Sequence, residues 1–380
     1  MRKILLFLVI ATTAITSRAQ DSICATVNEP GTLSQYLPKD TSDMYDVKSL
    51  KIIGSINSTD IGYIRAMGGN ASDGYKTDGR LRTLDLSEAK IVRGGNAYWT
   101  DPADAYETSS ILRDNTIGYD MFRECASLRY VTLPEGITEI KDGAFTLCTN
   151  LLKVNIPSTV KKIGEGFRKC FKLTSITLPE GITEIGDFCF SHCTGITELT
   201  VPSTVTTIGD GAFSYSGIKT IVLPEGVNSV GISAFSDCNN LSTILLPSTI
   251  RSIGDNAFIR DTTLTSLYCF AIKPPTVGQD AFALTSKKDF SKPIFYVPEY
   301  SKAFYEQQKE LSKNANIIEM ADGTTYSQIK EMISTTTGIA SLKRTFSPTK
   351  DSSRYNLSGQ RVSSSYKGIV IQNGRKFVAK

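Results

Sequence analysis

The sequence predicts a β-rich solenoid of parallel strands, with about eight turns of 22–24 residues and a cap at each end. The prediction rests on three observations, namely that prolines, phenylalanines and aliphatic residues before glycine all recur with one shared period. Prolines fall 22 or 23 residues apart between 134 and 247, and phenylalanines keep the same steps from Phe122 to Phe258, followed by Phe282. Aliphatic residues followed by glycine recur in register with both, although Lys141 replaces one glycine. A fixed period of this length is typical of proteins whose turns bury their apolar faces only against neighbouring turns.

One turn reads Cys-x-x-Leu-x-x-Ile-x-Leu-Pro-x-x-Val-x-x-Ile-Gly-x-x-Ala-Phe. The alternation that ends at Leu133 predicts a half-buried strand, and the following proline ends its hydrogen-bond ladder. The glycine allows a tight turn, and Ala-Phe places a large ring in the core. Two turns are one residue short, before Phe167 and after Phe213. Glu-Gly and Ser-Thr alternate after successive prolines, which suggests that a unit of two turns was duplicated.

This turn resembles the BspA-type leucine-rich repeat of bacterial surface proteins, and the resemblance covers residues 111–285. It implies a right-handed solenoid with a short helical or irregular convex side. It also implies export to the cell surface, with attachment to host proteins by some members of the family.

The segment before the repeats divides into a signal peptide, residues 1–19, and an N-terminal cap with degenerate repeats, residues 20–110. Arg2 and Lys3 precede an apolar run at 4–10 that is too short to span a bilayer, and small residues precede Gln20. We therefore expect a secreted or surface-held protein without a transmembrane segment. In the cap, Asp60 is expected to be the N-cap of a short helix. The cap resembles that of many BspA-type proteins.

The segment after the repeats is predicted to hold a C-terminal cap at 286–320, a linker at 321–350 and a basic tail at 351–380. The cap should contain a closing strand at 294–298, a helix at 302–313 and a short strand at 317–318, and the linker one helical stretch at 326–334. In the tail, Asn373-Gly374 between two β-prone runs indicates a hairpin. The tail is similar to sorting or attachment tails of secreted Bacteroidota-type proteins, which implies contact with secretion machinery. An ordinary terminal hairpin is the alternative.

The charges are distributed unevenly along the chain. Residues 20–340 carry 30 Lys and Arg against 37 Asp and Glu, whereas residues 341–380 carry nine against one. A nucleic-acid-binding protein would carry its positive charge on the folded body, so no nucleic-acid partner is expected.

Five cysteines occupy one position of the repeat, and Ser216 and Asp261 hold that position in two other turns. Stacking in register points their Cβ atoms the same way, which is poor geometry for disulfides. The sequence therefore predicts a ladder of buried thiols, with Cys24 and Cys269 left as a possible disulfide between the caps. The ladder consists of Cys125, Cys148, Cys170, Cys193 and Cys238.

The sequence offers little for catalysis or for a cofactor. The chain has a single histidine, His192, and neither an orienting partner nor an oxyanion donor accompanies its neighbour Cys193. We find no Ser-His-Asp pattern, phosphate loop or zinc spacing. We therefore predict a protein that is not an enzyme and holds no cofactor or metal. Acidic residues at 101, 104 and 107, near Trp99, could contact Ca²⁺ or carbohydrate, or form a solvated loop.

The outward positions of the repeat strands are rich in Ser and Thr and form the candidate binding face. Threonine suits a strand surface in any case, so the chemically richer positions are the candidates. These ligand-binding candidates are Tyr130, Lys153, Glu198 and Tyr268, with Trp99 in the cap. The predicted function is adhesion to an unidentified host or matrix protein or glycan. A non-enzymatic envelope scaffold or self-associating surface component is the alternative.

Overall fold

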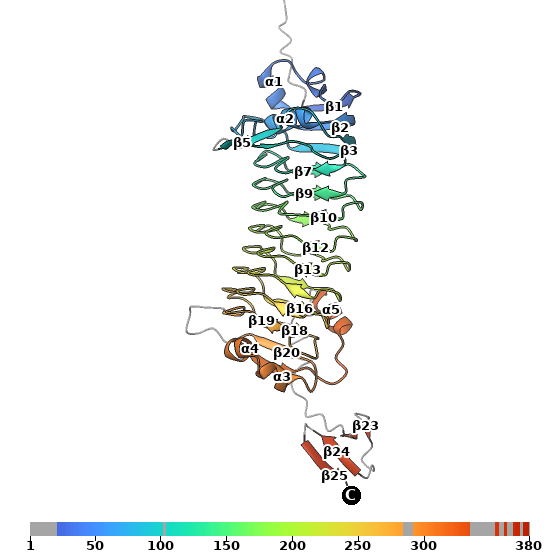
Figure 1. The fold of residues 1–380 in the computed structure, drawn as a ribbon, viewed down its shortest axis with the longest axis vertical. Helices are drawn as coiled ribbons and strands as arrows, with labels where there is room; N and C mark the ends of the chain where they lie inside the picture. Colours follow the sequence, from blue (N-terminus) through green and yellow to red (C-terminus); the bar gives the residue numbers. More distant parts are fainter. Residues whose placement is uncertain are drawn as a thin grey trace, which may run out of the picture.

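The computed structural model describes residues 21–101, 104–283 and 292–334, and the backbone of four strands between residues 354 and 379. The side chains of residues 101, 104–108 and 334 are not among those described. The predicted signal peptide lies outside these residues. Figure 1 shows an elongated stack of turns whose strands run across its long axis.

The longer strands form one wall of the solenoid in two parallel sheets. We call the outward surface of this wall the strand face. Neighbouring turns pair in register, so Thr83, Tyr130 and Lys153 lie side by side in one row. The first sheet contains β1 (Ser22–Val27), β2 (Ser49–Ile56), β3 (Thr83–Ile91), β7 (Tyr130–Thr132), β9 (Lys153–Asn155) and β11 (Ser175–Ile176). The second contains β14 (Thr220–Val222), β16 (Thr243–Leu246), β18 (Ser266–Cys269), β20 (Ile294–Val297) and β21 (Asn316–Glu319).

Two-residue strands form a second wall, again as two parallel sheets. They carry the aliphatic residue that precedes the repeat glycine, and its side chain points into the core. The first sheet contains β6 (Thr116–Ile117), β8 (Glu139–Ile140) and β10 (Lys162–Ile163). The second contains β12 (Glu184–Ile185), β13 (Thr207–Ile208), β15 (Ser229–Val230), β17 (Ser252–Ile253) and β19 (Thr276–Val277).

Each wall is interrupted beside one of the two shortened turns. The second wall breaks between β10 and β12, where Gly164-Glu165-Gly166 lacks one residue. The strand face breaks between β11 and β14, next to the shortened segment that contains Gly217. A Cβ on Gly217 would lie 2.1 Å from the carbonyl oxygen of Thr194, so the backbones of these turns approach closely. The missing residues therefore disturb the sheets locally without ending the stack.

A continuous column of phenylalanine rings fills the core, as the sequence predicts. Seven successive ring pairs from Phe122 to Phe282 stack with centroids 5.2–5.6 Å apart. All eight rings are fully buried. The column ends on Phe295, whose ring stands at 89° to that of Phe282 and so closes the stack.

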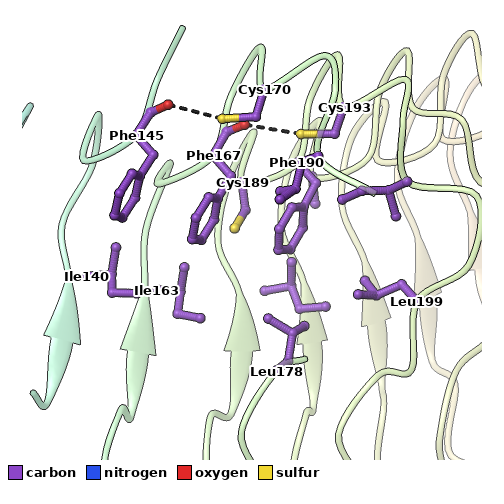
Figure 2. Packing of buried hydrophobic residues seen from close by; sticks show 14 of the residues in the cluster. Ile140, Phe145, Ile163, Phe167, Cys170, Leu178, Cys189, Phe190, Cys193 and Leu199 are labelled. Atoms are coloured by element: carbon purple, nitrogen blue, oxygen red, sulfur yellow. Dashed lines mark hydrogen bonds between the residues drawn. The ribbon is translucent and has the colours of Figure 1, made fainter. Parts of the chain in front are cut away.

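The thiol ladder runs beside this column, and all eight cysteines are free. From Cys148 on, the ladder thiols donate to the carbonyl oxygen of the phenylalanine in the preceding turn, with S···O distances of 2.9–3.1 Å. Figure 2 shows two of these bonds, from Cys170 to Phe145 and from Cys193 to Phe167. The possible disulfide between the caps does not form, because Cys24 is exposed on the first strand whereas Cys269 is buried on β18.

Side chains after the prolines join the turns in pairs. The Glu180 carboxylate accepts from the backbone N–H and hydroxyl of Ser203, and the N–H of Gly181 donates to Thr204. Glu225 makes the same two contacts with Ser248. The 45-residue superperiod therefore has a physical basis in these two pairs, since the Glu-Gly turn is hydrogen-bonded to the Ser-Thr turn that follows it.

The N-terminal cap packs helix α2 (Ser58–Met67) on the first turns, with η1 (Leu33–Gln35) and α1 (Thr41–Asp46) nearby. The N-cap of the helix is Asn57 rather than Asp60. Asp60 is its third residue, and its carboxylate accepts from the N–H groups of Asn57, Gly31 and Leu33. The prediction that Asp60 is the N-cap is therefore wrong, because this side chain ties the helix to the loop before η1. A hairpin of β4 (Trp99–Asp101) and β5 (Asp104–Ser109) completes the cap.

The C-terminal cap contains β20 and β21, as predicted, but two helices in place of one, α3 (Lys302–Glu306) and α4 (Lys309–Asn314). Helix α5 (Tyr326–Ser334) forms where the helical stretch is expected. The tail strands are β22 (Arg354–Asn356), β23 (Arg361–Val362), β24 (Gly368–Gln372) and β25 (Arg375–Ala379), and β24 and β25 pair as the predicted hairpin around 373–374.

We predict that thiol reagents will distinguish Cys24 from the other cysteines. In the native protein Cys24 should react quickly, because it alone is exposed, whereas burial raises the pKa of Cys125 to about 11 and of Cys193 to about 12. After denaturation eight thiols should react without a reducing agent. Fewer than eight in the denatured protein would contradict the ladder.

We also predict that Gly254→Ala will destabilise the solenoid by about 2 kcal/mol or more. A Cβ there would lie 2.6 Å from the backbone of Gly231 and Ile232 in the turn below. The matched control is Gly136→Ala, where nothing lies within 4 Å and only the left-handed conformation, φ +89°, opposes the change. The control should cost about 1 kcal/mol. Equal decreases in the free energy of unfolding of the two variants, measured by urea denaturation, would contradict the close stacking of turns.

Candidate functional site

The first half of the strand face is open to solvent. The Tyr130 side chain is 48% exposed at the centre of this region, and Lys153 beside it is exposed as well. Asn155, Ser175 and Thr177 continue the face with exposed polar side chains. Two of the predicted ligand contacts, Tyr130 and Lys153, are therefore brought together on adjacent strands.

Glu198 is exposed, but it does not continue this surface as part of a paired strand. It lies in the turn between β11 and β14, where the first sheet has ended and the second has not begun. The sequence predicts an uninterrupted wall, and this prediction is wrong here. The shortened turn that contains Gly217 follows, and it disrupts the strand pairing between the two sheets.

Tyr268 is buried, with 2% of its surface exposed, so its predicted role as an exposed contact is wrong. Its ring stacks on Tyr296 at 4.6 Å, and both lie beneath helix α5. Ile329 and Ile333 of the helix pack on this cluster, and the Tyr326 hydroxyl donates to the carbonyl oxygen of Leu223 at 2.7 Å. Residues 326–334, which the sequence assigns to a linker, therefore cover the second half of the strand face.

Trp99 is also buried, at 6% exposure, and is not an exposed ligand contact. The hairpin of β4 and β5 folds onto the repeats, and the Arg123 guanidinium lies 5.3 Å from the centroid of the indole. The acidic side chains at 101, 104 and 107 lie outside the described side chains, so the choice between a cation site and a solvated loop stays a prediction.

The His192–Cys193 pair has no geometry for nucleophilic catalysis. The His192 ring stacks on Tyr215 at 4.5 Å, and its Nδ1 lies 3.0 Å from the Ser191 hydroxyl. The Cys193 thiol instead bonds to the Phe167 carbonyl oxygen, and burial raises its pKa to about 12, which opposes thiolate formation. Within the described residues, no group of three or more His, Cys, Asp or Glu side chains is placed to hold a metal ion.

Sequence reasoning missed three basic residues that border the open half of the strand face. Lys48, Arg82 and Arg129 each occupy the corner before a strand, in three successive turns. Aligning the degenerate turns of the cap with the regular repeats would have placed them in one row. A shallow groove of about 330 Å³ also runs along the second wall, but its lining includes neither Tyr130 nor Lys153.

Comparison with known protein families identifies the type of repeat. A model of the family "BspA type Leucine rich repeat region" matches residues 115–241 and 165–289, with six copies. The repeat region belongs to this family. The fold agrees with the assignment, since it is a leucine-rich-repeat solenoid of short parallel strands.

Several solved structures are similar to parts of the chain. A leucine-rich cell surface protein from Faecalibacterium prausnitzii is 27% identical, with a TM-score of 0.36, over 44% of this chain and 55% of its own. The chain thus spans just over half the length of that relative. A leucine-rich repeat protein from Bacteroides ovatus is 19% identical (TM-score 0.32; 73% and 84% covered), and the pneumococcal vaccine antigen PcpA 17% identical (TM-score 0.37; 73% and 68% covered). A search of curated proteins gives no match.

None of the helices in the described parts of the chain combines the length and apolar character needed to cross a membrane.

We predict that Ile329→Asp will release α5 from the strand face, because a carboxylate cannot be buried against Tyr268 and Leu245 without a partner. Amide hydrogen exchange in residues 326–334 should accelerate by at least about tenfold. Glu331→Ala, on the exposed side of the same helix, should leave exchange unchanged. Slow exchange in the Ile329 variant would contradict the observed packing.

Proposed function

We propose that this protein is a secreted or cell-surface binding protein that acts in adhesion through its strand face. Residues 1–19 would direct its export, and no catalytic step is involved. The observation that carries the proposal is the open half of the strand face, where Tyr130 and Lys153 are exposed on adjacent strands. Similarity of the repeats to the BspA-type family supports the surface location.

The strand face suits recognition for physical reasons. The strands are held by the core on their inner side, so the outward side chains sit on a rigid backbone, and binding costs little further backbone entropy. An exposed tyrosine offers a large apolar surface together with a hydroxyl group, a combination typical of binding hot spots. The partner would be a host or matrix protein or a glycan, and the tail at 351–380 would serve sorting or attachment.

The test is a binding screen of the mature chain against immobilised matrix proteins and glycans at physiological salt. We expect a saturable interaction that Tyr130→Ala/Lys153→Ala weakens by at least about tenfold, since hot-spot truncations cost 1 kcal/mol or more each. The control Tyr75→Ala/Lys273→Ala removes the same side-chain types from exposed positions outside the strand face and should bind normally.

Two outcomes would overturn the proposal. One is an interaction that both double variants weaken equally. The other is the absence of any interaction, and concentration-dependent assembly in sedimentation would then favour a self-associating scaffold.

A further inference from the structure

The open half of the strand face is bordered by a row of cations. The N–H of Arg82 bonds to the Lys48 carbonyl oxygen, and the N–H of Arg129 bonds to the Arg82 carbonyl oxygen, both at 2.8 Å. These backbone bonds hold three basic residues at equivalent corners of successive turns, about 4.8 Å apart along the solenoid axis. In the next turn this corner is held by Leu152, but Lys153 follows it directly and pairs with Tyr130 in the adjacent row. We call Arg82, Arg129, Tyr130 and Lys153 the basic cluster.

The charges of the cluster are not neutralised within the described part of the chain. Lys48 pairs with Asp21 at 2.8 Å, and Lys51 on β2 pairs with Glu88 at 2.6 Å. By contrast, no described carboxylate lies within ion-pair distance of Arg82, Arg129 or Lys153, all of which are exposed. The acid nearest in the strand pairing, Asp85, lies 4.0 Å from Lys51.

This local excess of positive charge is unusual for the molecule. Residues 20–340 carry 37 acidic side chains against 30 basic ones, so a basic surface does not follow from composition. Unpaired arginines repel one another when they lie in adjacent turns, and such an arrangement is stabilised when an anion binds across them.

The surroundings of the cluster identify the kind of anion. Thr83 and Ser175 flank Tyr130 and Lys153 in the same row, and the next outward row contains Thr132 and Asn155 and, beside Lys51, Asp85. Hydroxyl and amide groups suit hydrogen bonding to sugar hydroxyls, and an exposed tyrosine ring can pack on the apolar face of a pyranose. The guanidinium forks of Arg82 and Arg129 match the oxygen geometry of sulfate and carboxylate groups. One aromatic ring and three free cations provide less stacking and less charge than grooves that track single-stranded nucleic acids.

We propose that the basic cluster binds a linear, sulfated polysaccharide that lies along the solenoid axis on the strand face. The proposal rests on the proposed function, since it names the partner class of the same face. Arg82, Arg129 and Lys153 would contact successive sulfate or carboxylate groups, while Tyr130 packs on a sugar ring between them.

The experiment measures binding of the mature chain to immobilised heparin, with chemically desulfated heparin, polyglutamate and a single-stranded oligonucleotide as competitors. The test variant is Arg82→Gln/Arg129→Gln/Lys153→Gln. Its matched control is Lys161→Gln/Lys219→Gln/Arg251→Gln, which removes three exposed charges from other turns. All proteins retain the basic tail, so a difference between the two variants reports on the strand face alone.

We expect the dissociation constant for heparin to rise by at least about tenfold in the test variant and by less than about threefold in the control. Wild-type binding should weaken with added salt, and soluble heparin should compete while desulfated heparin does not.

Three results would overturn the inference. The first is an equal loss of heparin affinity in the two variants. The second is unchanged heparin binding by the test variant, which would assign that binding to the tail. The third is competition by polyglutamate or the oligonucleotide that is as effective as competition by heparin. A chain that binds a matrix protein through Tyr130 and Lys153 but ignores heparin would overturn only this inference. A chain that binds nothing would overturn the proposed function as well.

Discussion

The constraint on which the structure depends is that each turn must accept a nearly identical turn a strand spacing above and below it. Residues at one repeat position therefore meet copies of themselves, and only side chains that tolerate this contact can occupy it. Phenylalanine rings satisfy the condition by parallel stacking at 5.2–5.6 Å. Glycine satisfies it at the turn after the second wall, where a Cβ on Gly231 or Gly254 would lie 2.6 Å from backbone of the preceding turn. The core stays continuous at the two shortened turns, because the phenylalanine column continues past them. The sheets, by contrast, are interrupted there.

The thiol ladder shows which residues the stacking of turns accepts at a buried position that can form a hydrogen bond. A cysteine here is small and apolar, and its thiol adds one weak hydrogen bond to a buried carbonyl that already accepts a backbone N–H of its own turn. Asp261 takes the position in the last described turn of the ladder, and its carboxylate accepts from the Cys238 N–H at 2.7 Å. Burial raises the pKa of Asp261 well above its usual range, which favours the uncharged form at a buried position that thiols or Ser216 hold in the other turns. At the other end of the ladder, the buried Arg65 donates to the carbonyl oxygens of Asp120 and Met121.

The repeat explains why the sequence predicts some parts of the molecule and not others. The strands, the ring column and the ladder could be predicted, because each rests on a residue type that recurs at a fixed position. Tyr268 could not, because its burial depends on Tyr326, whose hydroxyl bonds to Leu223 over a separation of 103 residues. The burial of Trp99 likewise depends on a hairpin that occurs once, packed on Arg123. Contacts that occur once leave no periodic signal in the sequence. The incorrect predictions therefore concern the caps and the candidate site.

These irregular elements also decide which part of the strand face is available. The repeat alone would expose the whole wall equally, but α5 covers the second half, and the first sheet ends before the turn that contains Glu198. What remains is a bounded surface centred on Tyr130, next to turns whose corners carry Lys48, Arg82 and Arg129. The charge of residues 20–340, with 37 acidic against 30 basic side chains, gives no sign of this basic surface. In a solenoid the charge that a partner meets is set by neighbouring turns within a few ångströms, so position in the repeat is a better guide to its ligand than the charge of the chain.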